Sequence, residues 1–212
     1  MQVDRPAPGE ELNRGPEPTR PRQAATVVVL RGGHERLEVL LVQRNPRARF
    51  MGGAWVFPGG AVDEAEAEAH GELAHRVAGI REVEEEAGIR LGDPDALLPF
   101  SRWITPAQIK IRFDTRFFLA AVPEDAQPRV DGAECVDWGW WAPVAALEAY
   151  AAGELTLVFP TIKTLEQLAG FDSAAALLEW ATGREVVPIE PRVVVEGEVA
   201  RVVLPGEPGY TD

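Results

Sequence analysis

The stretch from Leu73 to Gly88 constrains the fold most strongly, because its spacing is that of a helix with two different faces. Leu73, Val77, Ile80 and Val83 recur every three or four residues, which is the period of an α-helix packed on a core. Gly88 stands at the end of this pattern, where glycine often terminates a helix. We therefore expect one amphipathic helix of about four turns.

The other face of this helix carries acid. Glu82, Glu85 and Glu86 lie at positions i, i+3 and i+4, so their carboxylates share one face, whereas Glu84 points about 200° away from Glu82. Arg81 precedes Glu85 by one helical turn and can pair with a carboxylate. Three neighbouring carboxylates suit a hard cation such as Mg²⁺ or Mn²⁺. The alternative is a solvated acidic surface.

Strands and further helices surround this helix in the sequence. Apolar and β-branched runs predict strands at 25–30, 37–44, 54–60, 97–105, 114–122 and 134–141. Segments that each end in glycine predict helices at 143–153, 160–170 and 173–183, and the tail at 186–204 is typical of extended chain. The interleaving of strands and helices predicts an α/β or α+β sandwich.

The chain divides into an arm and one domain. Residues 1–22 contain five prolines and almost no large apolar side chains, so we expect a flexible Pro-rich arm. The remaining 23–212 fit a single domain with a helical and extended appendage from about residue 143 onwards.

Composition excludes several classes of function. The net charge of -13 argues against broad binding to nucleic acid or anionic membranes, so an anionic substrate needs a local cationic patch or a metal. The single cysteine, Cys135, excludes an internal disulfide and is expected to be a buried apolar residue rather than a nucleophile. No apolar run approaches the roughly 18 residues of a membrane span, and the N-terminus lacks the apolar core of a signal peptide. We expect a soluble cytoplasmic protein.

Two segments together carry a family resemblance. Residues 57–60 (FPGG) and 81–89 (REVEEEAGI) resemble the Nudix box, which runs G, five residues, E, seven residues, then R-E-U-x-E-E-x-G-U with U an aliphatic residue. Gly60 is the box glycine, and the second half matches at Arg81, Glu82, Val83, Glu85, Glu86, Gly88 and Ile89. The resemblance to the Nudix hydrolases implies an α/β/α sandwich with a mixed β-sheet, here followed by C-terminal helices and extended segments. It also implies a diphosphatase that uses Mg²⁺ or Mn²⁺.

The box departs from the family spacing in its first half. Arg81 lies 21 residues after Gly60 where the family has 14, so seven residues are extra. An insertion continued as helix leaves the carboxylate face nearly unrotated, because seven residues are almost two turns. The box glutamate falls on Glu66 when counted from Gly60, but on Leu73 when counted back from Arg81. The sequence does not decide among the acidic candidates Asp63, Glu64, Glu66, Glu68 and Glu72.

The resemblance also implies roles for particular residues. The implied metal ligands are Glu82, Glu85, Glu86 and a backbone carbonyl of Gly59. Glu85 also stands as a catalytic group near the attacking water, and Arg81 pairs with a carboxylate or braces the neighbouring loop. Glu134 is our candidate base outside the box, with a surface charge at a strand edge as the alternative. A metal suits this chemistry because it neutralises the diphosphate and lowers the pKa of water, and glycines let the backbone approach closely.

The substrate is implied by the run LLVQRNPRARFMGGAWVFPGG at 40–60. It resembles the motif that precedes the box in coenzyme A diphosphatases, and the lengthened box resembles the acyl-coenzyme A branch. Such an enzyme cuts coenzyme A or acyl-coenzyme A into 3′,5′-adenosine diphosphate and 4′-phosphopantetheine or its acyl form. Because arginine binds phosphate in a bidentate manner, the candidate substrate contacts are Arg44, Arg49, Gly60, Lys110, Arg112 and Arg116.

Several alternatives stay open on the sequence. Phe159, Pro160 and Thr161 either begin a helix or line a groove for an acyl or pantetheine group. The diphosphate could belong to ADP-ribose, NADH or a nucleotide sugar, or the domain could bind such a metabolite without catalysis. The arm and the C-terminal extended segments could pair across subunits, which favours a homodimer.

Overall fold

The computed structural model describes residues 11–13, 15–196 and 199–210. A mixed sheet forms its centre, in the strand order β3-β2-β1-β6-β5-β8, with β4 paired to β1 and β7 to β2. The strands of this sheet are β1 (Arg22–Arg31), β2 (Glu38–Arg44), β3 (Trp55–Val56), β4 (Gly59–Ala61), β5 (Leu98–Ile104), β6 (Phe113–Ala121), β7 (Cys135–Trp141) and β8 (Pro188–Ile189). β1 and β6 are parallel, as are β5 and β8, and the other pairs in this sheet are antiparallel.

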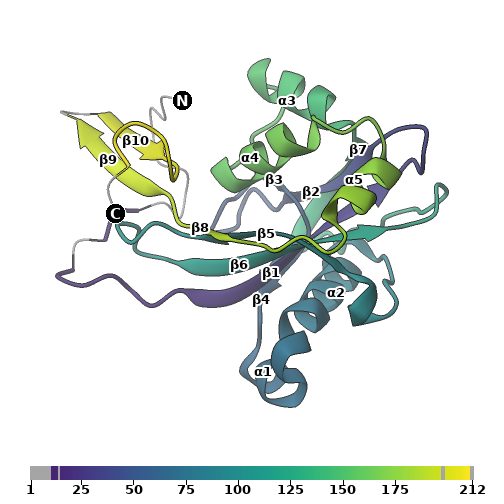
Figure 1. The fold of residues 1–212 in the computed structure, drawn as a ribbon, viewed down its shortest axis with the longest axis horizontal. Helices are drawn as coiled ribbons and strands as arrows, with labels where there is room; N and C mark the ends of the chain where they lie inside the picture. Colours follow the sequence, from purple (N-terminus) through teal and green to yellow (C-terminus); the bar gives the residue numbers. More distant parts are fainter. Residues whose placement is uncertain (1–10, 14, 197–198, 211–212) are drawn as a thin grey trace.

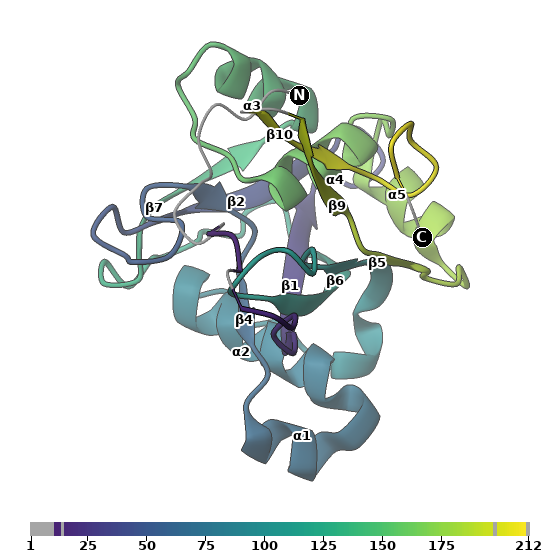
Figure 2. The same cartoon turned by 90° about the vertical axis from the view of Figure 1, so that its left-hand side faces the viewer.

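Helices cover both faces of the sheet (Figure 1). α1 (Glu64–His70) and α2 (Ala74–Ala87) lie on one face, and α3 (Pro143–Ala151), α4 (Phe159–Leu168) and α5 (Ala174–Ala181) lie on the other. β9 (Arg192–Glu196) and β10 (Val199–Val203) form a separate antiparallel pair beside α4 (Figure 2). This arrangement confirms the expected α/β/α sandwich with a mixed sheet.

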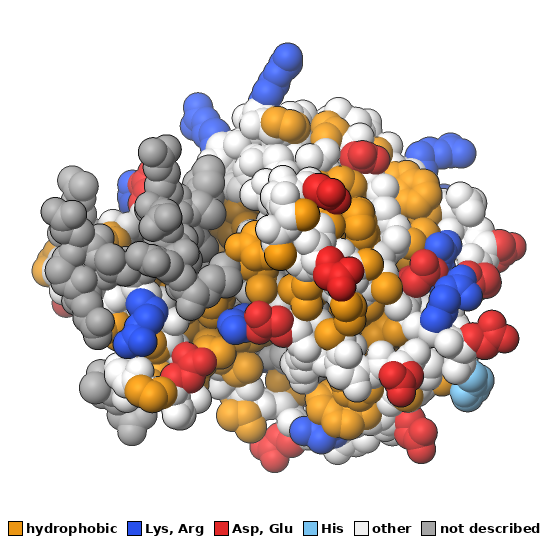
Figure 3. Space-filling model, turned by 90° about the horizontal axis from the view of Figure 1, so that it is seen from above, with side chains coloured by type: hydrophobic (Ala, Val, Ile, Leu, Met, Phe, Trp, Pro, Cys, Tyr) orange, Lys and Arg blue, Asp and Glu red, His pale blue; other side chains and the backbone are white. Residues whose placement is uncertain are grey.

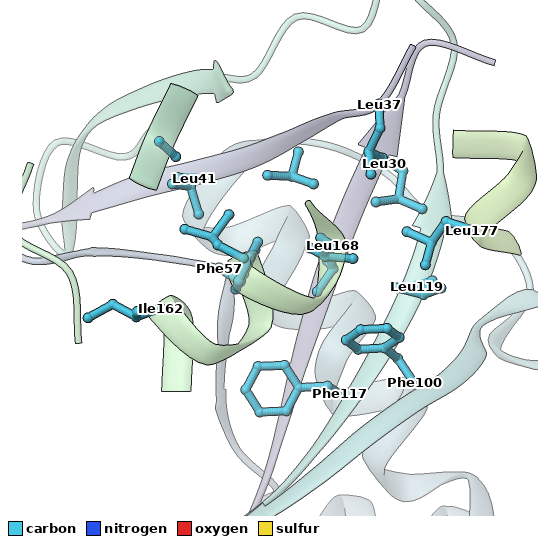
Figure 4. Packing of buried hydrophobic residues seen from close by; sticks show 14 of the residues in the cluster. Leu30, Leu37, Leu41, Phe57, Phe100, Phe117, Leu119, Ile162, Leu168 and Leu177 are labelled. Carbon is cyan, nitrogen blue, oxygen red and sulfur yellow. The ribbon is translucent and has the colours of Figure 1, made fainter. Parts of the chain in front are cut away.

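Strand β1 shows why its sequence is apolar at almost every position. Ala25, Val27 and Val29 point into the core beneath α2, whereas Val28 and Leu30 point into the core beneath α3, α4 and α5. A strand buried on both faces has a continuous apolar sequence rather than an alternating one. The larger core is closed by leucines and phenylalanines from strands and helices on the second face (Figure 4).

The predicted acidic helix is confirmed as α2. It spans 14 residues, and Gly88 ends it in the left-handed conformation with φ +64°. The Gly88 N–H donates to the Glu84 carbonyl at 2.9 Å. This closes the last turn as a glycine C-cap does.

The apolar face of α2 differs from the predicted one. Leu73 lies just before the helix and is exposed, so it does not belong to the core. Close packing on the sheet is achieved instead by small residues: a Cβ at Gly79 would come within 2.8 Å of Val27 Cγ2. The apolar residues buried on this helix are Ala74, Ala78, Val83 and Ala87.

The extra residues in the box do not continue α2. They form the end of α1 and a 3₁₀ turn at Gly71–Leu73, with Gly71 at φ +52° between them. A positive φ breaks helical geometry and favours glycine. The insertion therefore extends a separate short helix, α1, which packs against α2, as Figure 2 shows below the sheet.

The remaining strands and helices match their predicted positions closely. The predicted strand at 54–60 is divided into β3 and β4 by Phe57 and Pro58, and the predicted tail contains β8, β9 and β10. Of the expected arm, residues 1–10 and 14 lie outside the described residues. Leu12 pairs with Ile109 in a β-bridge, so the described part of the arm contacts the loop before β6. In the described part of the chain, no helix is long and apolar enough to cross a bilayer.

Candidate active site

Two buried carboxylates of α2 face Gly59 and Gly60, which begin β4 directly after Phe57 and Pro58 and are called the glycine turn below. Glu86 accepts a hydrogen bond from the Gly59 N–H at 3.0 Å. A Cβ on Gly60 would lie 2.5 Å from Glu82 Cδ, so any larger residue would force this carboxylate to shift. Both glutamate side chains are almost wholly removed from solvent. The turn and the helix therefore lie side by side, although Gly60 and Glu82 are 22 positions apart in the sequence.

The negative charges of Glu82 and Glu86 are costly in this buried position. Burial raises the pKa of Glu86 to about 7, against the lowering effect of the Gly59 amide, and the charges of Glu82 and Glu134 raise it further. Burial also raises the pKa of Glu82, although its bond to Arg81 lowers it. Arg44 is the cation beside Glu86, with 3.6 Å between Nη1 and Oε1. A site of this kind favours an additional cation.

Arg81 connects the helix, the turn and the insertion. Its Nη1 donates to Glu82 at 2.8 Å and to Glu85 at 2.9 Å, and its Nη2 donates to the Ala61 carbonyl at 3.1 Å. Its Nε donates to Glu66 at 2.8 Å. The bond to Glu66 raises the pKa of Arg81 further, so the guanidinium stays charged. Arg81 therefore holds Glu82 in place rather than facing open solvent.

Among the acidic candidates, Glu66 occupies the position of the box glutamate. Among the five acidic candidates, it is the one that pairs with Arg81, and it also caps α1 by accepting the Asp63 N–H at 2.9 Å. Five residues separate Gly60 from Glu66, as in the family spacing between the box glycine and the box glutamate. The insertion therefore follows the box glutamate and precedes Arg81.

The other predicted catalytic groups lie at the rim of the site. The Glu85 side chain is largely exposed and turned towards Arg81, so it does not join the buried pair. Glu134 is exposed just before β7, yet its charge raises the pKa of both Glu82 and Glu86, which places it near them. Cys135 is buried, and burial and Glu86 raise its pKa to about 12, as expected for a core thiol rather than a nucleophile.

These residues fit a divalent cation by the chemistry of their donors. Carboxylate oxygens are the ligands that Mg²⁺ and Mn²⁺ prefer, and Glu82 and Glu86 present them beside a backbone turn. Within the described residues, no three acidic, histidine or cysteine side chains already converge as a closed metal site. Water and substrate oxygens complete the coordination of Mg²⁺ in such open sites.

The predicted substrate contacts separate into two groups. Arg44 and Gly60 line the same cavity beside Glu86. Arg49 is exposed and lies outside that cavity wall. Arg116 is half-buried on the α2 side of β6, where burial and its charge lower the pKa of His75. The structure therefore brings two of these residues to the carboxylates and leaves Arg49 and Arg116 apart.

Lys110 and Arg112 both contact the N-terminal segment, Lys110 through its backbone N–H and Arg112 through its side chain. Lys110 donates its N–H to the Glu11 carbonyl at 2.8 Å. Arg112 is buried, and its three nitrogens donate to the Thr105 carbonyl at 2.9 Å, the Thr19 carbonyl at 2.9 Å and Glu190 at 2.8 Å. Because these bonds occupy the guanidinium, the substrate role predicted for Arg112 is corrected to a structural one.

An apolar cavity of about 410 Å³ opens at the glycine turn, and the sequence indicated only a small part of it. Phe159, Pro160 and Thr161 both begin α4 and line this cavity, so the two alternatives for them are compatible. Leu12 and Val202 also line it, from opposite ends of the chain. No local pattern relates those two positions, which is why sequence reasoning missed most of this wall.

Comparison with protein families decides the class of the protein. The profile of the NUDIX domain matches residues 20–160, which is well over half of the chain. The chain belongs to the NUDIX family. This confirms the expected family, and with the related hydrolases below it confirms the hydrolase class.

The most informative relatives cover most of this chain. Acyl-coenzyme A diphosphatase NUDT19 of Homo sapiens is 24% identical over 93% of this chain and 82% of its own length. Putative nudix hydrolase 7 of Caenorhabditis elegans is 25% identical over 90% of this chain and 75% of its own length. Among solved structures, a NUDIX hydrolase from Alicyclobacillus acidocaldarius is 30% identical with a TM-score of 0.68, covering 76% of this chain and 96% of that one.

Proposed function

We propose that this NUDIX protein is a divalent-metal-dependent diphosphatase that hydrolyses coenzyme A or its acyl thioesters. The observation that carries the chemistry is the buried Glu82 and Glu86 pair beneath the Gly59 and Gly60 turn. Glu82 has Arg81 as its partner, but the more deeply buried Glu86 has Arg44 only at 3.6 Å, so a further positive charge stabilises the pair. A bound Mg²⁺ or Mn²⁺ supplies that charge, neutralises the diphosphate and lowers the pKa of the attacking water.

The residues of the chain have separate tasks in this proposal. Glu82 and Glu86 would hold the metal, with the backbone carbonyl of Gly59 as a further candidate ligand. Arg81 is a positioning residue, because its bonds to Glu82 and Glu66 fix the ligand carboxylate. Glu85 and Glu134 are the candidates for accepting the proton of water, since both are exposed at the rim of the pair.

The choice of substrate has two supports. Curated relatives that cover most of this chain are named acyl-coenzyme A diphosphatases. Arg44, which belongs to the sequence run that resembles the coenzyme A motif, stands between Glu86 and the apolar cavity. A guanidinium at this position can contact a diphosphate oxygen when the metal is bound. The products are 3′,5′-adenosine diphosphate and 4′-phosphopantetheine, or its acyl form.

The substrate is tested by a product assay with Mg²⁺ or Mn²⁺. Coenzyme A, acyl-coenzyme A, ADP-ribose, NADH and nucleotide sugars are compared by specificity constant, with products identified by mass. We expect 3′,5′-adenosine diphosphate from the coenzyme A compounds at the best specificity constant. A preference for ADP-ribose or NADH would overturn the substrate while keeping the chemistry, and silence across the panel would favour a binding domain.

The metal role is tested by Glu86→Gln, which keeps the size of the side chain and removes its charge. We expect Mg²⁺-dependent hydrolysis to be largely abolished while the circular dichroism spectrum stays unchanged. Glu84→Gln is the matched control, because Glu84 lies on the same helix but faces solvent. Unchanged activity in Glu86→Gln would refute the metal assignment.

The cytoplasmic location and the homodimer stay predictions from the sequence.

A further inference from the structure

The apolar cavity, hereafter the chamber, begins where the carboxylate site ends. Gly59, Gly60 and Arg44 line it at the glycine turn. Its floor comes from sheet residues such as Trp103, and its other side comes from the start of α4 at Phe159, whose ring packs edge-on to Trp103. Its volume of about 410 Å³ lies in the range of small-molecule sites. The chamber is therefore placed to receive one of the two groups joined by the diphosphate.

The charge of the walls identifies which group fits. Among the described residues that line the chamber, Arg44 is the one with a charged side chain, and it stands at the end near Glu86. Burying a phosphate without cations along the remaining wall is unfavourable. The phosphorylated adenosine of coenzyme A therefore belongs outside, and the uncharged half belongs inside.

The mouth of the chamber carries large apolar side chains exposed to water. Leu12 is 49% exposed and Ile111 is 42% exposed, and both line the chamber. Seen from the side of α3, α4 and α5, hydrophobic side chains extend across the molecule towards the side where β9 and β10 lie (Figure 3). A ligand that covers Leu12 and Ile111 gains free energy in proportion to the apolar area removed from water.

Hydrogen bonds hold this mouth in place. The Asn13 N–H donates to the Gln108 carbonyl at 2.7 Å, next to the bridge between Leu12 and Ile109. Arg112 connects the N-terminal segment at Thr19 to Glu190, which precedes β9. The segments from the two ends of the chain are thus fixed to the loop that carries Ile111, so the wall is preformed.

We propose that the chamber binds the acyl chain of a coenzyme A thioester, and that Leu12 and Ile111 determine the chain length that the enzyme prefers. This inference rests on the proposed function and assigns specificity to residues outside the Nudix box. The pantetheine arm, which joins the diphosphate to the acyl group, enters the inner chamber first. A short acyl chain ends beyond this arm within the chamber, whereas a longer chain reaches the mouth and covers these two side chains.

The test is a chain-length series from coenzyme A through acetyl-, butyryl-, octanoyl- and palmitoyl-coenzyme A. We expect kcat/KM of the wild type to rise by up to about fourfold for each methylene that becomes buried, and to level off once the chain leaves the mouth. Ile111→Gln and Leu12→Gln should each lower the ratio of octanoyl-coenzyme A to coenzyme A by about tenfold, because each polar side chain removes apolar contact.

Val144→Gln is the matched control for the two variants. Val144 is 51% exposed on α3 and does not line the chamber, so the same substitution there should leave the whole series unchanged. A cooperative thermal unfolding transition is required of all three variants, as evidence that they fold. If the enzyme hydrolyses every compound of the series with the same kcat/KM, whatever the length of the acyl chain, this inference is overturned and the proposed function stands. An unchanged ratio in both chamber variants would do the same, whereas wild type inactive on the entire series would overturn both.

Discussion

Replacing Glu86 by glutamine should stabilise the metal-free protein while it removes activity. Burial raises the pKa of Glu86 from 4.5 to about 7, so ionising this side chain costs about 3 kcal/mol more in the folded than in the unfolded chain. Glutamine avoids that cost and can still accept the Gly59 N–H through its amide oxygen. Without metal, the wild-type protein is therefore less stable to unfolding than the Glu86→Gln variant.

The sign of the effect gives it a characteristic pH dependence. A carboxyl whose pKa is raised on folding contributes no penalty below its unfolded pKa, and the penalty grows as pH rises towards the folded pKa. The advantage of Glu86→Gln should therefore be below about 1 kcal/mol at pH 5 and reach about 3 kcal/mol at pH 8. Saturating Mg²⁺ should reduce or reverse it, because the metal stabilises only the wild type in proportion to its binding.

The assay is urea unfolding followed by tryptophan fluorescence, with a chelator or with Mg²⁺, at both pH values. Glu84→Gln serves as the control, since this exposed residue pairs with the exposed Arg90 at 2.8 Å and should change the free energy of unfolding by less than about 0.5 kcal/mol. Equal stability of wild type and Glu86→Gln at pH 8 without metal would refute the argument that burial of the Glu86 charge outweighs the stabilisation from Arg44 and the Gly59 N–H.

Three further predictions concern the turn, the sheet and the core. Gly60→Ala should lower hydrolysis on the order of 10- to 100-fold with little change in circular dichroism, because its Cβ displaces the Glu82 carboxylate; full activity in steady-state assays would contradict this. Asp114→Asn should be less stable than the wild type near neutral pH, since Arg102 lowers the pKa of Asp114. That difference in unfolding free energy should shrink as pH falls below about 4, where Asp114 becomes protonated. Leu165→Ala should cost about 2 to 5 kcal/mol in urea unfolding, because Leu165 is fully buried in the larger core.

The sequence by itself determined the main elements and which residues of α2 and the glycine turn are candidates for the site. The helical period ending at Gly88 placed α2, and the apolar runs placed the strands within a few residues, because these patterns arise from local geometry and burial. The spacing of Glu82 and Glu86 put both carboxylates on one face of that helix. The box motif added the glycine turn that faces them.

Only the tertiary structure decided which acidic residue pairs with Arg81 and which cations are free to meet a substrate. Glu66 was one of five equivalent candidates until α1 brought it to Arg81, and Arg112 was a candidate phosphate contact until its bonds to Thr19 and Glu190 were seen. The chamber depends on the same kind of packing, since Leu12 and Val202, from opposite ends of the chain, line one cavity. Contacts between distant segments are set by how the elements pack, and no periodicity or spacing along the chain encodes which partner a side chain will find.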